Sequence, residues 1–120
     1  MSNWSRHQPK KIAVVTATRA EFGLLSRLIH LLDQSPEFEL QLFVTGAHLL
    51  ASQGNTVNEI IQQGLSITQK IPILSEKEGH PETNLSQATA TALAEFGKAF
   101  EQYQPDGVIV LGDRYELLGI

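Results

Sequence analysis

The chain has 120 residues, no cysteine and a formal net charge of −4, with 42% hydrophobic and 18% charged residues. This composition is ordinary for a globular domain, offers no basic surface to nucleic acid or an anionic membrane, and excludes disulfides, zinc–thiolate sites and a cysteine nucleophile within these residues. No apolar run approaches the roughly 20 residues that span a bilayer. We expect a cytoplasmic protein that binds neither nucleic acid nor a membrane.

The chain opens on a polar segment, and residues 1–11 contain no apolar stretch of the kind that a signal peptide needs. We predict a disordered lead-in over residues 1–10 and a Rossmann-like domain over residues 11–120. The last apolar run delivers polar residues close to the end of the chain, as a strand does where it meets a ligand site. We therefore expect an incomplete amino-terminal domain, with its remainder and a second domain absent from this chain.

Strand-like and helix-like segments alternate along the sequence. Apolar β-rich runs indicate buried strands, and apolar residues that recur every three or four positions indicate helices. In chain order we predict a strand over 12–16, a helix over 18–34, a strand over 38–45, a loop or short helix over 46–54, a helix over 55–64, a strand over 66–73, a surface loop over 74–83, a helix over 84–103 and a strand over 107–111. This order is typical of an α/β fold with a doubly wound parallel sheet and right-handed crossovers.

Two pairs of residues have the spacing of a capping box, in which a threonine and a glutamate three positions later cap the start of a helix. Thr18 and Glu21 precede one apolar helical stripe, and Thr56 and Glu59 precede the next. We expect both helices to begin with these contacts, and Gly64 to end the second helix.

The apolar stripes of two helices are expected to face the core. In the first helix they are Phe22, Leu24, Leu25, Leu28, Ile29, Leu31 and Leu32. In the last helix they are Leu85, Ala88, Ala92, Leu93, Phe96 and Phe100.

The first strand-to-helix turn, residues 16–23, is a candidate anion site. The amino terminus of a helix offers free N–H groups and a partial positive charge, and Arg19 adds a forked donor that matches phosphate oxygens. The turn contains neither a dinucleotide-binding glycine fingerprint nor a P-loop. The alternative is an ordinary surface arginine beside a helix cap.

Asp113 and Arg114 follow the last predicted strand, at the carboxyl end where ligands bind in open α/β sheets. The aspartate could act as a general acid or base, bind a sugar hydroxyl or cap a helix, and Glu116 in the following turn fits the cap. These roles are compatible, and the residues alone leave them open.

His48 lies just beyond the second predicted strand, also at the carboxyl edge of the sheet. This position makes it a candidate site residue, with a surface or structural role as the alternative. No His, Asp and Glu residues cluster at the spacing of metal ligands, and we expect no metal and no cofactor.

Four short segments stand out together: Thr18-Arg19-Ala20-Glu21-Phe22-Gly23, Val44-Thr45-Gly46-Ala47-His48-Leu49, Gly54-Asn55-Thr56 and Gly112-Asp113-Arg114-Tyr115-Glu116. In this order and at these spacings they resemble the UDP-N-acetylglucosamine 2-epimerase family. The resemblance runs from about Lys11 to the last residue. It is closest to the hydrolysing branch, because the non-hydrolysing branch typically has Arg-Pro-Glu and Gly-Asp-Thr in two of these segments.

The resemblance implies a two-domain, glycosyltransferase-B-like enzyme that holds a UDP-sugar between two doubly wound domains. It implies that Arg19 and Arg114 bind the UDP moiety and that Gly23 lets the UDP approach the backbone closely. Ala17 departs from the family, in which glycine often occupies this turn.

The resemblance also assigns acid/base chemistry at the sugar to Asp113, and places His48 and Glu21 in the substrate pocket. In the family reaction, UDP is eliminated to leave a 2-acetamidoglucal, and water then adds with inversion at C2. The family's further acidic and histidine residues would lie beyond Ile120.

The expected function is therefore hydrolytic 2-epimerisation of UDP-N-acetylglucosamine to UDP and N-acetylmannosamine, for sialic-acid-type sugar biosynthesis. The alternatives are hydrolytic epimerisation of UDP-N,N'-diacetylbacillosamine in a legionaminic-acid pathway, a non-hydrolysing epimerase, and a nucleotide-binding module without catalysis. The resemblance suggests a homo-oligomer, a dimer or a tetramer. We expect the 120-residue chain alone to be catalytically inactive and prone to aggregate.

Overall fold

The computed structural model describes residues 8–49, 56–73, 76–77, 80–81 and 85–111. The elements in chain order are β1 (Lys10–Thr16), α1 (Arg19–Gln34), β2 (Phe38–Thr45), the short 3₁₀ helix η1 (Gly46–Leu49), α2 (Val57–Gln62), β3 (Gln69–Ile71), β4 (Glu76–Lys77), β5 (His80–Pro81), α3 (Leu85–Tyr103) and β6 (Gly107–Ile109).

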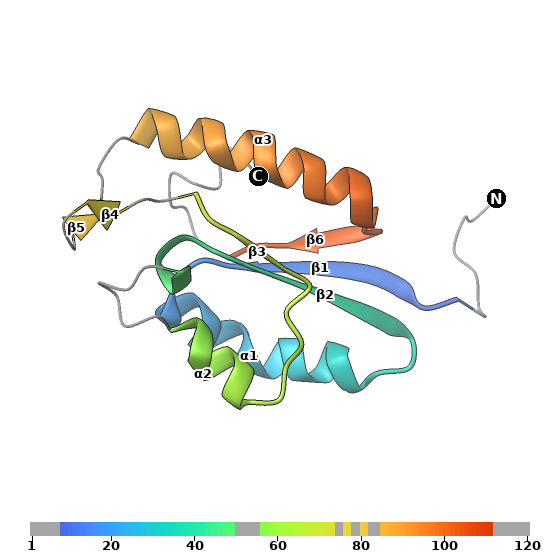
Figure 1. Cartoon of the computed structure of the whole chain (residues 1–120). Helices are drawn as coiled ribbons and strands as arrows, with labels where there is room; N and C mark the ends of the chain where they lie inside the picture. Colours follow the sequence, from blue (N-terminus) through green and yellow to red (C-terminus); the bar gives the residue numbers. More distant parts are fainter. Residues whose placement is uncertain (1–7, 50–55, 74–75, 78–79, 82–84, 112–120) are drawn as a thin grey trace.

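Four parallel strands form one sheet in the order β3-β2-β1-β6. Helices α1 and α2 cover one face of this sheet and α3 covers the other (Figure 1). From β1 the strands follow one another outward to β3, and the chain then returns through α3 to β6 on the other side of β1. The direction in which strands are added therefore reverses at β1. The predicted α/β, doubly wound fold is confirmed, and the carboxyl ends of the strands share one edge, where ligands bind in such sheets.

The core has two layers, one on each face of the sheet. Beneath α1 and α2, buried Val14 and Leu42 of the sheet pack with Phe22 and Ile29 of α1 and Ile60 of α2. Burial of each such apolar side chain stabilises the fold by about 1.5–3 kcal/mol. This layer fixes α1 and α2 against the sheet and against each other.

The layer beneath α3 is aromatic. Phe43 of β2 is fully buried, and its ring centroid lies 5.6 Å from those of Phe100 and Tyr103 in α3, with near-perpendicular rings. Phe96 lies beside them in tilted contact with Phe43. Edge-on aromatic pairs add about 0.5–1.5 kcal/mol beyond their area, so these rings anchor the crossover helix.

The structure corrects part of the predicted core. Leu24, Leu28 and Leu31 of α1 are exposed, Leu24 by 77%, and Leu93 of α3 is 65% exposed. The sheet contacts only one stripe of each helix, and these leucines lie outside it. The remaining predicted core residues of α1 are buried, as are Ala88, Ala92 and Phe96 of α3, and Phe100 is partly buried.

Several boundaries differ from the predictions. Strand β1 begins at Lys10, inside the predicted lead-in, most of which (residues 1–7) lies outside the described residues. Strand β3 is shorter than predicted, and just before it the backbone N–H of Leu42 donates to the Thr68 hydroxyl at 2.9 Å. The predicted surface loop over 74–83 contains the short antiparallel pair β4–β5. The chain's predicted division into lead-in and incomplete domain stays a prediction.

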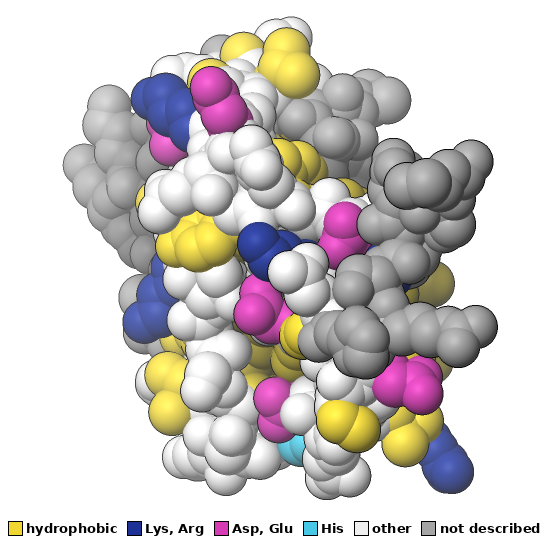
Figure 2. Space-filling model, turned by 90° about the vertical axis from the view of Figure 1, so that its right-hand side faces the viewer, with side chains coloured by type: hydrophobic (Ala, Val, Ile, Leu, Met, Phe, Trp, Pro, Cys, Tyr) yellow, Lys and Arg dark blue, Asp and Glu magenta, His cyan; other side chains and the backbone are white. Residues whose placement is uncertain are grey.

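At the amino ends of the strands, acidic and basic side chains of the described residues are interspersed with apolar ones, and neither sign of charge gathers (Figure 2). None of the described helices combines the length and the apolar character needed to cross a membrane.

Candidate functional site

The turns that follow β1 and β2 are locked together at the carboxyl edge of the sheet. Gly46 has a φ of +59°, and a Cβ built there would lie 3.1 Å from both the Cβ and the carbonyl oxygen of Ala17. The backbone N–H of His48 donates to that same carbonyl oxygen at 3.1 Å. Glycine at position 46 suits so close an approach, because it lacks a Cβ and adopts positive φ without strain.

The threonine half of the predicted capping box at the start of α1 is confirmed, whereas the Glu21 carboxylate binds the N–H of Ala17 instead of that of the cap residue Thr18. The hydroxyl of Thr18 accepts a hydrogen bond from the backbone N–H of Glu21 at 3.3 Å, and the Glu21 carboxylate accepts one from the N–H of Ala17 at 3.3 Å. Glu21 and His48 are both predicted pocket residues. The Glu21 carboxylate binds the backbone N–H of Ala17, and the N–H of His48 binds its carbonyl oxygen. The N–H groups of Ala17 and Glu21 already have partners. An anionic ligand at this helix terminus therefore has to use other donors.

His48 is fully buried, and both of its ring nitrogens have partners. Nε2 lies 2.9 Å from the hydroxyl of Thr16, and Nδ1 lies 2.6 Å from the hydroxyl of Thr56. The Phe22 ring meets the imidazole edge-on, with centroids 6.3 Å apart. Burial lowers the pKa of His48 to about 4, although a hydrogen bond with the backbone of Thr18 raises it. At neutral pH the imidazole is therefore a neutral link between β1 and α2.

This burial predicts a pH dependence of stability. The pKa of His48 is about 6.5 in the unfolded chain and about 4 in the folded chain, so between these values the unfolded chain binds a proton that the folded chain does not. The free energy of unfolding should be unaffected by His48 above pH 6.5 and should fall as the pH drops toward 4, by about 3 kcal/mol in all. Urea unfolding at pH 7 and 4.5 should show a smaller pH effect for His48→Gln than for the native protein.

The matched control for this prediction is His30→Gln, because the Nε2 of His30 contacts Gln63 at 2.9 Å in an exposed pair. That variant should keep the native pH effect. Equal pH effects in the native protein and the His48 variant would contradict the assignment.

The predicted capping box of the next helix is wrong. The Thr56 side chain makes no cap hydrogen bond, because its hydroxyl contacts His48. The Glu59 carboxylate instead pairs with Arg19, with 3.2 Å between Oε2 and Nε. The end of this helix is as predicted: Gly64 follows it with a φ of +81° and donates from its N–H to the carbonyl of Ile61.

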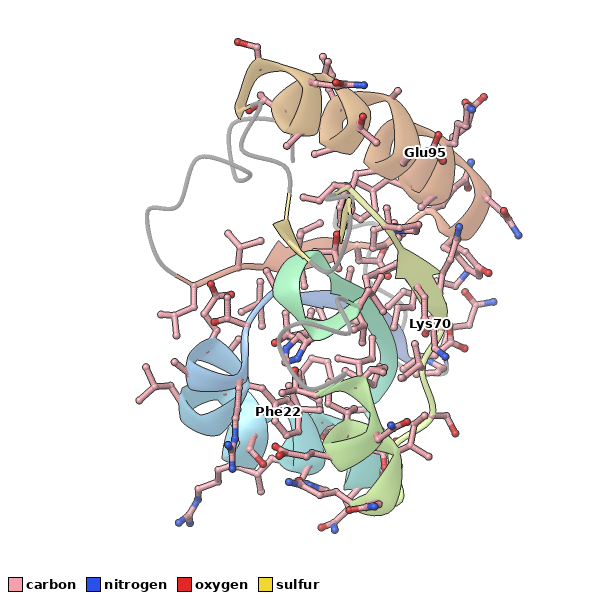
Figure 3. The ribbon with its side chains drawn as sticks, turned by 60° about the vertical axis from the view of Figure 1, so that its left-hand side comes forward. Phe22, Lys70 and Glu95 are labelled. Atoms are coloured by element: carbon pink, nitrogen blue, oxygen red, sulfur yellow. The ribbon has the colours of Figure 1, made fainter. Side chains whose placement is uncertain are left out.

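The start of α1 thus lies beside the start of α2. Figure 3 looks toward this edge and shows Phe22 between the two helices, whereas Lys70 and Glu95 lie on β3 and α3. Arg19 is the first residue of α1, and its side chain is 73% exposed. Gly23 lies one turn further along, exposed, and a Cβ built on it would meet nothing within 4 Å.

Asp113 and Arg114 lie outside the described residues, and their predicted roles stay predictions. Strand β6, which precedes them, pairs in parallel with β1, and Ile109 lies opposite Val14. Its carboxyl end therefore points to the same edge as the carboxyl end of β1. Among the described residues, no three His, Asp or Glu side chains come together as metal ligands would.

Comparison with known proteins decides the family. The family model described as UDP-N-acetylglucosamine 2-epimerase matches residues 30–120. The chain belongs to the UDP-N-acetylglucosamine 2-epimerase family. The resemblance deduced from the four sequence segments is thereby confirmed.

Three curated relatives of this epimerase-family chain carry different names. It is 41% identical over 111 residues to the GDP/UDP-N,N'-diacetylbacillosamine 2-epimerase (hydrolyzing) of Campylobacter jejuni, and 38% identical to the polysialic acid biosynthesis protein P7 of Escherichia coli. It is 27% identical over 103 residues to the UDP-N-acetylglucosamine 2-epimerase of Salmonella typhimurium. The first two matches cover 92% of this chain but 28% of each relative, so the chain spans little more than a quarter of their length.

Solved structures show the same fold. A UDP-N-acetylglucosamine 2-epimerase structure aligns with 93% of this chain and 29% of its own length, with a TM-score of 0.75 and 23% identity. The Neisseria meningitidis enzyme bound to UDP-GlcNAc aligns with 91% of this chain and 27% of its own length, with a TM-score of 0.73 and 17% identity. The expected fold class is confirmed, because the chain shares the fold of these epimerases over more than nine-tenths of its length.

Proposed function

We propose that this epimerase-family chain carries the UDP-binding part of a hydrolysing 2-epimerase that acts on UDP-2-acetamido sugars. The observation that carries the proposal is the difference in identity among its relatives. Two diacetylbacillosamine 2-epimerases named as hydrolysing, from Campylobacter jejuni and Legionella pneumophila, are each 41% identical to it, against 27% for the Salmonella typhimurium UDP-N-acetylglucosamine 2-epimerase.

The proposed reaction has two steps, an elimination of UDP and an addition of water. Asp113 accepts the C2 proton while the bond from C1 to the UDP oxygen breaks, and water then adds across the resulting double bond. Arg19 and Arg114 stabilise the negative charge that develops on the departing diphosphate. His48 and Glu21 support the pocket: the N–H of His48 ties the turn after β2 to Ala17 in the turn after β1, and the Glu21 carboxylate binds the N–H of Ala17 within that turn.

The substrate is UDP-N-acetylglucosamine or UDP-N,N'-diacetylbacillosamine. The sequence motifs fit both, and the names of two relatives at 41% identity favour the second. The protein P7 relative, at 38% identity, fits a sialic-acid-type pathway. We further propose a cytoplasmic homo-oligomer, a dimer or a tetramer, that requires no cofactor.

The test is phosphorus NMR of the full-length protein with each UDP-sugar in turn. Release of free UDP from either sugar supports the hydrolysing reaction, and the larger kcat/KM identifies the substrate. Accumulation of an epimer that retains UDP would indicate the non-hydrolysing branch. Binding of UDP without turnover of either sugar would indicate a non-catalytic binding module.

A substitution at Gly23 separates its predicted role in UDP binding from its place in the helix. Alanine is a better helix former than glycine, and a Cβ at position 23 meets nothing, so Gly23→Ala should raise the free energy of unfolding by up to about 1 kcal/mol. If UDP approaches this backbone closely, the same methyl group should weaken UDP binding several-fold. Calorimetric titration with UDP checks this. Unchanged affinity in the stabilised variant would remove Gly23 from the site.

A further inference from the structure

The first turn of α2 contacts two of the residues assigned to the site. Thr56 contacts the imidazole of His48 at 2.6 Å, and Glu59 pairs with Arg19 at 3.2 Å. The sequence spacing would have let these two side chains cap their own helix. The structure uses both in contacts with other elements instead.

This arrangement fixes the position of the Glu59 carboxylate. His48 joins the Thr16 hydroxyl at the end of β1 to the Thr56 hydroxyl at the start of α2. Val57 and Ile60 of the same turn are buried in the core beneath α1. Glu59 therefore projects from a turn that is anchored on both sides.

The geometry of the ion pair decides what it does to Arg19. Glu59 contacts Nε through Oε2 at 3.2 Å, and the terminal nitrogens Nη1 and Nη2 are the two-pronged donor that an arginine presents to phosphate oxygens. An exposed arginine loses rotamer entropy when it binds a ligand. A carboxylate that holds Nε lowers that loss. A carboxylate across the two terminal nitrogens would instead compete with the ligand.

We propose that Glu59 is a positioning residue for Arg19, which orients the guanidinium toward the diphosphate of a UDP-sugar by holding its Nε. This inference rests on the proposed function, because it takes Arg19 as a ligand of UDP. Glu59 itself touches no reacting atom. Its effect should therefore appear in UDP affinity and KM and be small in kcat.

The experiment measures the dissociation constant of UDP by calorimetric titration of the full-length protein. Arg19→Ala should weaken binding at least tenfold, and Glu59→Gln should weaken it about 2- to 5-fold, the range measured for exposed ion pairs. In an Arg19→Ala background, Glu59→Gln should have no further effect. The matched control is Glu95→Gln, because Glu95 is equally exposed, 42% against 43%, and pairs with Lys98 on α3.

Each result decides the proposal. Unchanged affinity in Arg19→Ala would overturn the role of Arg19 in UDP binding, and the inference with it. Weaker binding in Arg19→Ala with unchanged or tighter binding in Glu59→Gln would overturn the inference alone. A loss in Glu59→Gln that persists without Arg19, or that also appears in Glu95→Gln, would show a general structural effect and overturn it too.

Discussion

Asp113→Asn is expected to lower kcat of the full-length protein about a thousandfold, within the range for loss of a general base, and to leave UDP affinity within about twofold. Asparagine has the shape of aspartate but cannot accept the C2 proton. It is also as good a helix cap as aspartate, so the substitution preserves a capping role and removes only the acid/base role. Steady-state UDP release and calorimetric UDP binding measure the two effects separately.

The control for this prediction is Asp106→Asn, the same substitution at the other end of β6. The Asp106 carboxylate accepts a hydrogen bond from the backbone N–H of Lys11 at 2.8 Å, at the amino end of the sheet. Its substitution should leave kcat within a few-fold of the native value. Native turnover in Asp113→Asn would show that this carboxylate is not the base, and a parallel loss of UDP binding would show that its role is in the ground-state complex.

Gly46→Ala is expected to destabilise the protein by about 2–5 kcal/mol. A side chain at a φ of +59° costs about 1–2 kcal/mol, and the new Cβ would lie 3.1 Å from the Cβ and the carbonyl oxygen of Ala17, which adds an overpacking cost of about 1–3 kcal/mol. The turns after β1 and β2 would have to separate. Urea unfolding gives the free energy, and UDP affinity should fall as the site edge opens.

Two further variants isolate the contact from the backbone strain. Gly64 has a φ of +81° but no atom within 4 Å of a Cβ, so Gly64→Ala should cost only about 1 kcal/mol. Ala17→Gly should recover part of the stability that Gly46→Ala loses, because it removes one of the two close contacts. Equal losses at positions 46 and 64, without rescue, would mean that the close approach has no energetic consequence.

Local signals in the sequence were sufficient for the sheet and the start of α1. The Thr18 cap works because both partners, the N–H of Glu21 and the hydroxyl, lie within one turn of chain. The identical spacing of Thr56 and Glu59 predicts a cap that does not form, because Thr56 contacts His48 and Glu59 pairs with Arg19 instead. A capping pattern records what a side chain can do locally and not which distant group competes for it.

Helical periodicity likewise identified the helices more reliably than their buried faces. A second apolar stripe at helical spacing is exposed, and it consists of Leu24, Leu28 and Leu31. Which stripe meets the sheet depends on how the helix is oriented on the strands. That orientation is set by packing across the whole layer and is not encoded in the spacing within one helix.

The candidate site was predictable where it depends on topology. Arg19, Glu21 and His48 were expected at the carboxyl edge because each follows a parallel strand, and the structure places all three there. The contact between Gly46 and Ala17, which are 29 positions apart, carried no such signal. The glycine directly after β2 was the available clue, since a turn against a neighbouring backbone often requires one.

The central claim is tested most directly by proton NMR of the full-length protein turning over UDP-N-acetylglucosamine and UDP-N,N'-diacetylbacillosamine in D2O. We predict that one of them gives free UDP together with the 2-epimeric sugar carrying deuterium at C2, because the base exchanges the C2 proton with solvent. A product that retains hydrogen at C2, or an epimer still attached to UDP, would contradict the proposed elimination and hydrolysis.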